Sequence, residues 1–234
     1  MTDYTQQVLF IMGQGASGSA WHYQITAARE AGFSPIVYDH LASGTSRSPF
    51  TFQELVDEAR DHLGSARAVV GTSIGARIAA TLAAEGHVDT LILGAPHARV
   101  TKTQALLSQE QHSVAEIAAL NLSPDSTRDP REEQHWLTLI ALGQRRVDPQ
   151  AYVVPSDHVD GFDLREMYAH ITAQTTIIEY ADDAMIHRWQ TQEVADTIPG
   201  THLVRLEHAG HWGYLEQHAG FNRIMLDALR GSTD

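Results

Sequence analysis

Short runs of apolar residues recur along the chain, and glycine, proline or polar residues bound each of them. Because these runs are shorter than ordinary helices, they predict buried strands of a parallel sheet. The predicted strands are residues 8–12, 35–39, 68–70, 88–93, 175–179 and 202–206.

Segments with helical composition or spacing separate these strands. We expect helices over residues 21–31, 51–63, 74–80, 186–198 and 214–230. Thr51 followed by Glu54 has the spacing of a capping box, which fixes the start of the second helix. Strands that alternate with helices predict an α/β fold with a mostly parallel sheet of about six strands and right-handed crossovers.

The alternation stops between residues 97 and 171. Helical patterns occupy residues 106–120 and 131–142 of this stretch, and we find no convincing strand in it. The pattern predicts a helical cap, or lid, over residues 97–171, inserted into a core made of residues 1–96 and 172–234. Such an insertion is expected over the carboxyl ends of the strands, where α/β sheets bind their ligands.

Composition narrows the classes of function. The chain has 234 residues, of which 43% are hydrophobic, so it can bury the core of one domain. A formal net charge of −13 argues against nucleic acid or an anionic membrane as the main partner. The absence of cysteine excludes disulfides and thiolate catalysis. We expect a cytoplasmic protein without a signal peptide or membrane helix; a homodimer is left open.

The strongest chemical signal surrounds Ser73. Gly71, Ser73 and Gly75 form a G-x-S-x-G motif that leads from an apolar strand into an Ala-rich helix. This strand–turn–helix context is that of a nucleophile elbow, which exposes the serine hydroxyl at the end of the sheet. It also leaves the Ile74 amide at a helix N-terminus, where it can face an anion. A plain glycine-rich turn is the alternative.

A glycine-rich loop follows the first strand over residues 13–20. Gly13, Gly15 and Gly18 match G-x-G-x-x-G, and Asp39 ends the next strand, as dinucleotide binding would require. The other interpretation of the loop is an oxyanion hole, in which backbone amides near Gln14 face the Ser73 hydroxyl. The downstream elbow favours the oxyanion hole.

A serine nucleophile needs a base and a group that orients the base. His211 is the candidate base, because it follows the last strand and has a glycine on either side, Gly210 and Gly213. His208 is its competitor. Asp182 and Asp183 follow the fifth strand and are the candidate acids; both could instead cap the following helix. These groups could also bind a metal, but we expect no metal and no cofactor.

These motifs and their order resemble the α/β-hydrolase superfamily. Met12-Gly13-Gln14-Gly15 falls where this family places its oxyanion loop, which implies that the Gln14 amide helps to hold an oxyanion. Asp39, Gly44 and Ser46 match a further loop of the family. The family's acid stands three positions after a residue that is Tyr180 here, and this spacing selects Asp183. The resemblance thus implies a triad of Ser73, Asp183 and His211, with Gln14 and Ile74 as oxyanion donors.

The C-terminal region is similar to the meta-cleavage-product hydrolases, which cleave carbon–carbon bonds. The similarity lies in Gly210-His211-Trp212, Glu216 and Phe221-Asn222-Arg223. We therefore predict a serine hydrolase that cleaves an ester, thioester or activated carbon–carbon bond of a small, largely apolar substrate. The candidate substrate contacts are Gly13, Trp136 and Trp212, with Trp189, Tyr152 and Phe162 as further apolar candidates. A lyase or cofactor-free oxygenase, and a binding protein with a vestigial triad, are the rival functions.

Overall fold

The computed structural model describes residues 6–14, 16, 18–39, 50–100, 122–124, 129–144, 157 and 161–231, with the backbone alone at residues 137 and 140–144. The helix expected over residues 106–120 lies outside these residues, as do Gly15, Gly44, Ser46 and Tyr152.

The described residues form one six-stranded parallel sheet, as the apolar runs predict. Its spatial order is β2-β1-β3-β4-β5-β6. The strands are β1 Gln7–Ile11, β2 Ser34–Tyr38, β3 Ala68–Thr72, β4 Thr90–Gly94, β5 Gln174–Tyr180 and β6 His202–Leu206. The order reverses between β1 and β3, and such a switch point opens a crevice for ligands at the carboxyl ends of the strands.

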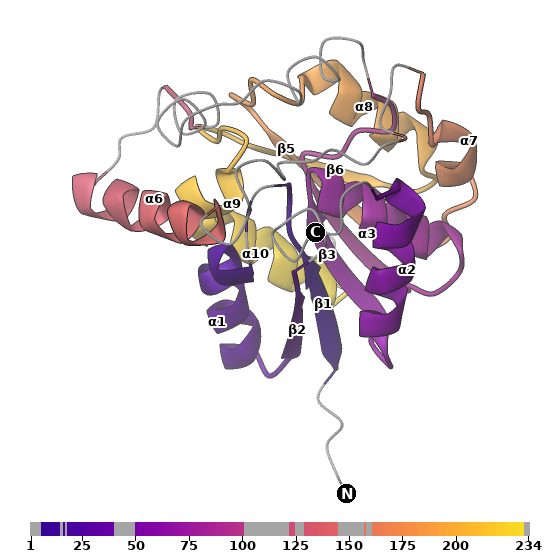
Figure 1. Cartoon of the computed structure of the whole chain (residues 1–234), viewed down its shortest axis with the longest axis horizontal. Coiled ribbons are helices and arrows are strands. Elements are labelled where there is room, and N and C mark those ends of the chain that lie inside the picture. Colours follow the sequence, from indigo (N-terminus) through magenta and orange to yellow (C-terminus); the bar gives the residue numbers. More distant parts are fainter. Residues whose placement is uncertain are drawn as a thin grey trace, which may run out of the picture.

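Helices cover both faces of this sheet (Figure 1). One face packs against α2 Phe52–Leu63, α3 Ile74–Ala84, α7 Arg165–Tyr168 and α8 Arg188–Thr197. The other face packs against η1 Gly18–Trp21, α1 His22–Glu30, α9 Gly213–Glu216 and α10 His218–Leu229. The two layers enclose two apolar clusters, with the sheet between them.

Three helix predictions are wrong in their boundaries. The expected closing helix over 214–230 is divided into α9 and α10 at Gln217, whose side-chain amide donates a hydrogen bond to the carbonyl of His208 over 3.1 Å. The helix expected from residue 186 begins at Arg188, because the preceding residue, His187, is still extended. The helix expected from residue 21 begins with the 3₁₀ turn η1 instead.

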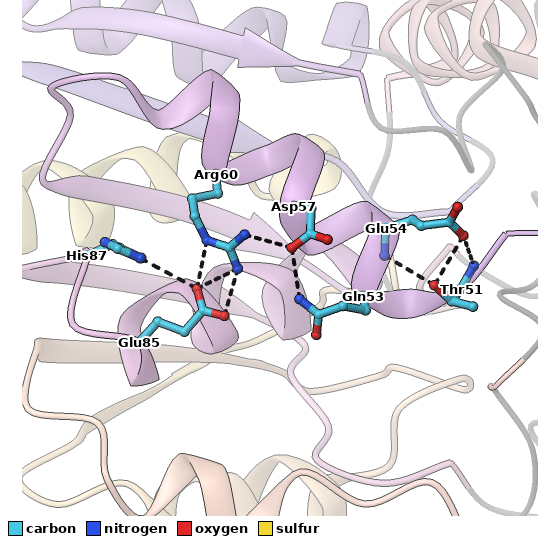
Figure 2. Close-up of polar contacts among 7 residues, drawn as sticks. All are labelled: Thr51, Gln53, Glu54, Asp57, Arg60, Glu85 and His87. Carbon is cyan, nitrogen blue, oxygen red and sulfur yellow. Dashed lines mark hydrogen bonds and ion pairs between the residues drawn. The ribbon is translucent and has the colours of Figure 1, made fainter.

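The start of α2 is as predicted. The Glu54 amide donates to the Thr51 hydroxyl over 3.3 Å, and the Thr51 amide donates to the Glu54 carboxylate over 2.6 Å (Figure 2). This reciprocal capping box satisfies two amides that a helix start leaves unpaired. Further along α2, Arg60 forms ion pairs with Asp57 and with Glu85, which follows α3, so the two helices are also joined at the surface.

The stretch expected to form a cap contains α6 Pro130–Gln144 and α7 among its described residues. Trp136 of α6 is buried with the cluster on the η1 face, and Tyr168 of α7 is buried with the cluster on the α3 face. The described helices of this stretch thus extend the two layers of the core on opposite sides of the sheet (Figure 1). None of the described helices has the length and apolar character needed to cross a membrane.

Candidate active site

Ser73 lies between β3 and α3 with a φ of 55° and a ψ of −122°. A non-glycine residue with positive φ is strained, and such strain persists only where the surroundings enforce it. The surroundings here are two glycines. A Cβ on Gly71 would collide with the carbonyl of Gly75, and a Cβ on Gly75 would collide with the carbonyls of Ile11 and Met12. The motif therefore allows α3 to pack closely enough to turn Ser73 outward.

The switch point of the sheet brings the glycine loop beside the elbow. Ile11 at the end of β1 pairs with Gly71 of β3, so the residues that follow the two strands are neighbours. A Cβ added to Gly13 would lie 3.3 Å from the Cβ of Ser73, which places the loop in contact with the serine. Gln14 follows directly in this loop, and its role as an oxyanion donor stays a prediction.

His211 and Asp183 complete a hydrogen-bonded chain that starts at Ser73. The Nε2 atom of His211 lies 3.1 Å from Ser73 Oγ, and its Nδ1 atom lies 2.8 Å from Asp183 Oδ2. A carboxylate can only accept, so Nδ1 carries the proton and Nε2 is free to accept from the Ser73 hydroxyl. The side chains of His211 and Asp183 are 11% and 1% exposed, respectively, so little water competes for these bonds.

The Asp183 carboxylate also accepts hydrogen bonds from the backbone that follows it. Its Oδ1 atom accepts the backbone amides of Met185 and Ile186, each over 2.8 Å. The carboxylate therefore organises the turn before α8 as well as contacting His211. From the sequence, a contact with the histidine and a capping role are alternatives for Asp183. In the structure Oδ2 contacts the imidazole and Oδ1 accepts the backbone amides.

His208 and Asp182, the competing candidates for the base and the acid, have other surroundings. His208 is exposed and has a φ of 55°, whereas His211 is largely buried beside Ser73. Asp182 accepts a hydrogen bond from the hydroxyl of Ser123. Among the residues that the structure describes, no cluster of three or more histidine or acidic side chains could hold a metal.

The glycine loop has a contact that bears on its dinucleotide alternative. The amide of Gly18 donates a hydrogen bond to the Asp39 carboxylate. A Cβ on Gly18 would also collide with the side chain of Val37, so glycine is required here for η1 to pack against β2. These contacts account for Gly18 and Asp39 without a ribose.

The aromatic candidates have different surroundings. Trp136 and Trp212 are 2% and 7% exposed and pack in the apolar cluster that also contains Trp21. Trp189 is 47% exposed and lies beneath the Arg99 guanidinium, 5.4 Å from it. Contact of these side chains with a substrate stays a prediction.

A buried cation lies one turn beyond Ser73. Arg77 of α3 is 1% exposed, and its guanidinium carbon stands 5.0 Å and 4.6 Å from the ring centres of Phe52 and Phe162. Burial lowers the pKa of Arg77 to about 10.

On the other side of the elbow, burial raises the pKa of Tyr180, whose hydroxyl lies 3.4 Å from that of Thr72. Tyr180 is therefore neutral at physiological pH, at the start of the loop that carries Asp183.

Two further residues support the site. Glu216 accepts the amide of Gly210 over 2.7 Å, and Gly210 directly precedes His211. Ser123 is fully buried and contacts both Asp182 and Glu216. No sequence signal identifies Ser123, because its partners are 59 and 93 residues away.

The chain was compared with known proteins. The model of the Alpha/beta hydrolase family matches residues 8–224. The chain is 26% identical to a protein of Mycobacterium tuberculosis provisionally named non-heme bromoperoxidase BpoC, over 94% of this chain and 92% of that protein. It is 25% identical to a protein of Pseudomonas savastanoi provisionally named carbamate hydrolase RutD, over 96% and 95% of the two chains.

Solved structures give the same picture of the fold. The structure of Rv0554 from Mycobacterium tuberculosis superimposes with a TM-score of 0.83 at 25% identity, covering 98% of this chain and 92% of that one. The enol-lactonase from Burkholderia xenovorans superimposes with a TM-score of 0.81 at 23% identity, covering 97% and 92%.

Proposed function

The chain belongs to the alpha/beta hydrolase family, and from this premise we propose that it is a serine hydrolase with Ser73, His211 and Asp183 as its triad. The observation that carries the proposal is the hydrogen-bonded chain from Ser73 Oγ through His211 to Asp183, over 3.1 Å and 2.8 Å. A serine hydroxyl is a weak nucleophile unless a base in hydrogen-bond reach removes its proton.

The proposed reaction proceeds through an acyl-enzyme. His211 Nε2 takes the proton of Ser73 as Oγ attacks the substrate carbonyl, and later returns it to the leaving group. Asp183 holds the imidazole in the required tautomer and stabilises the imidazolium. The amides of Gln14 and Ile74 hold the oxyanion, a contribution of about 10² to 10³ in rate for each donor. Water then releases the acid and regenerates Ser73.

The proposed substrate is a small, largely apolar molecule with an ester, thioester or activated carbon–carbon bond. Trp212, the apolar residue directly after His211 in the chain, supports an apolar substrate. The relative named as a carbamate hydrolase is consistent with attack on a carbonyl that bears a leaving group. A panel of aryl esters of increasing acyl length, together with a vinylogous diketone, would separate ester from carbon–carbon cleavage.

The triad is tested with the variant Ser73→Ala. We expect the wild-type protein to hydrolyse a short aryl ester and to gain the mass of one fluorophosphonate adduct at Ser73, as measured by intact-mass spectrometry. The Ser73→Ala variant should lose both properties while keeping its thermal stability. Full esterase activity in this variant would refute the assignment.

A second candidate is a non-hydrolytic reaction on the same fold. The likeness to the protein named as a non-heme bromoperoxidase favours including it. In that case His211 would act as a general base without a covalent intermediate. Turnover of the natural substrate that survives Ser73→Ala but not His211→Ala would support this candidate over the hydrolase.

A further inference from the structure

Ser123 lies between two loops. The acid loop, residues 181–187, follows β5 and carries Asp183, and the base loop, residues 207–212, follows β6 and carries His211. The Ser123 hydroxyl donates to Asp182 Oδ2, and Asp182 is the neighbour of Asp183 in the chain. The Ser123 backbone amide donates to Glu216 Oε1 over 2.7 Å. Ser123 is 0% exposed, so bulk water does not compete for either bond.

Glu216 extends this connection to the base. Its second oxygen, Oε2, accepts the amide of Gly210 over 2.7 Å, immediately before His211. The residue is 8% exposed, and a carboxylate so far from water depends on such donors because an unpaired buried charge is costly. The two oxygens of Glu216 thus tie Gly210 to Ser123.

The two loops also contact each other directly. The amide of Asp182 donates to the carbonyl of Ala209 over 2.9 Å, and the amide of Ala181 donates to the carbonyl of Leu206 over 3.0 Å. The acid loop, the base loop and Ser123 therefore form a closed set of hydrogen bonds around the Asp183–His211 pair.

We propose that Ser123 is a positioning residue, which holds the acid and base loops in register so that His211 can reach Ser73. Ser123 belongs to the residues that the sequence predicts as a cap, and its bonds to Asp182 and Glu216 place it beside the loops that carry the acid and the base. The kinetic part of the inference rests on the proposed function. The geometric part, the fixed Asp183–His211 pair, does not.

Three variants isolate the hydroxyl bond. Ser123→Ala removes it and keeps the backbone amide that binds Glu216. Asp182→Ala removes the same bond from the other side, whereas Asp182→Asn retains an oxygen acceptor. We expect kcat to fall about tenfold in the two alanine variants and KM to stay within about twofold. A displacement near 1 Å costs about 10² in rate, and the attachment of Ser123 to Glu216 is kept in these variants. Asp182→Asn should restore kcat to within about threefold of the wild type.

A double variant checks that one bond explains both effects. Ser123→Ala combined with Asp182→Ala should be no slower than either single variant, because the partners of one interaction are not additive. A tenfold further loss would mean that the two side chains act separately, and would overturn the proposal.

A spectroscopic measurement separates positioning from general destabilisation. The proton between His211 Nδ1 and Asp183 should give a far-downfield ¹H resonance in the wild type, which we expect to broaden or move upfield in Ser123→Ala. The matched control is Thr175→Val, which removes a buried hydroxyl bond to the Ala173 carbonyl near the opposite end of β5. This control should lose stability and keep both kcat and the resonance.

Besides an additive double variant, two further results would overturn the inference. The first is a Ser123→Ala variant that behaves like Thr175→Val, with kcat and the imidazole resonance unchanged. The second is a raised KM at constant kcat, which would assign Ser123 to substrate binding. Failure of the proposed function is a different result, namely turnover that persists in Ser73→Ala, and the resonance still decides the role of Ser123 in that case.

Discussion

Replacing Asp183 by asparagine tests whether this side chain selects the tautomer of His211. The Oδ1 atom of Asp183 accepts the amides of Met185 and Ile186, and Oδ2 accepts His211 Nδ1. An asparagine has a single oxygen, which the two backbone amides require. Its NH₂ group must therefore point at His211, where two donors cannot face each other, and the imidazole proton moves to Nε2.

The expected loss is large because the base is disabled and not merely displaced. With its proton on Nε2, His211 presents a donor to Ser73 and cannot accept the hydroxyl proton. We expect kcat to fall by about 10⁴, as the same change does in the Ser-His-Asp template, which corresponds to about 5.4 kcal/mol of transition-state stabilisation. The thermal midpoint should change little, since both backbone amides keep their acceptor.

Steady-state hydrolysis of an aryl ester and the rate of fluorophosphonate labelling measure this loss, and a circular-dichroism melt measures the fold. Asp196→Asn, on the exposed surface of α8, controls for the change in net charge and should retain wild-type rates. A folded Asp183→Asn variant within tenfold of the wild-type kcat would refute the reasoning, because it would show that His211 keeps its tautomer without the carboxylate.

Two further substitutions test the elements that carry the site. Thr51→Ala removes the hydroxyl that caps α2 and should lower the free energy of unfolding by about 1 kcal/mol in a urea titration, with esterase activity unchanged; an unaltered urea midpoint would contradict this role. Gly75→Ala drives a Cβ into the carbonyls of Ile11 and Met12, so we expect a loss of about 1–3 kcal/mol together with reduced kcat, as α3 and Ser73 move away from β1. Retention of both properties would show that the elbow has room that the structure does not indicate.

Features with a signal within a few residues of the chain could be predicted from the sequence. The apolar runs predicted all six strands to within about two residues, and Thr51 with Glu54 predicted the capping box. The glycines around Ser73 predicted the sharp turn, since close approach of backbones excludes a Cβ there. Such features follow from side-chain volume, hydrophobicity and local hydrogen bonding, and residues close together in the sequence carry their signal.

Tertiary structure decided the contacts between distant segments. Only the fold shows that Asp183 uses one oxygen for His211 and the other for the turn before α8. The division of the closing helix at Gln217 is visible only in the fold. The same holds for the packing of α6 and α7 in opposite layers and for the position of Ser123 between two loops. The reason is that these contacts depend on how whole elements pack against the sheet, and packing sums over residues that no local pattern relates.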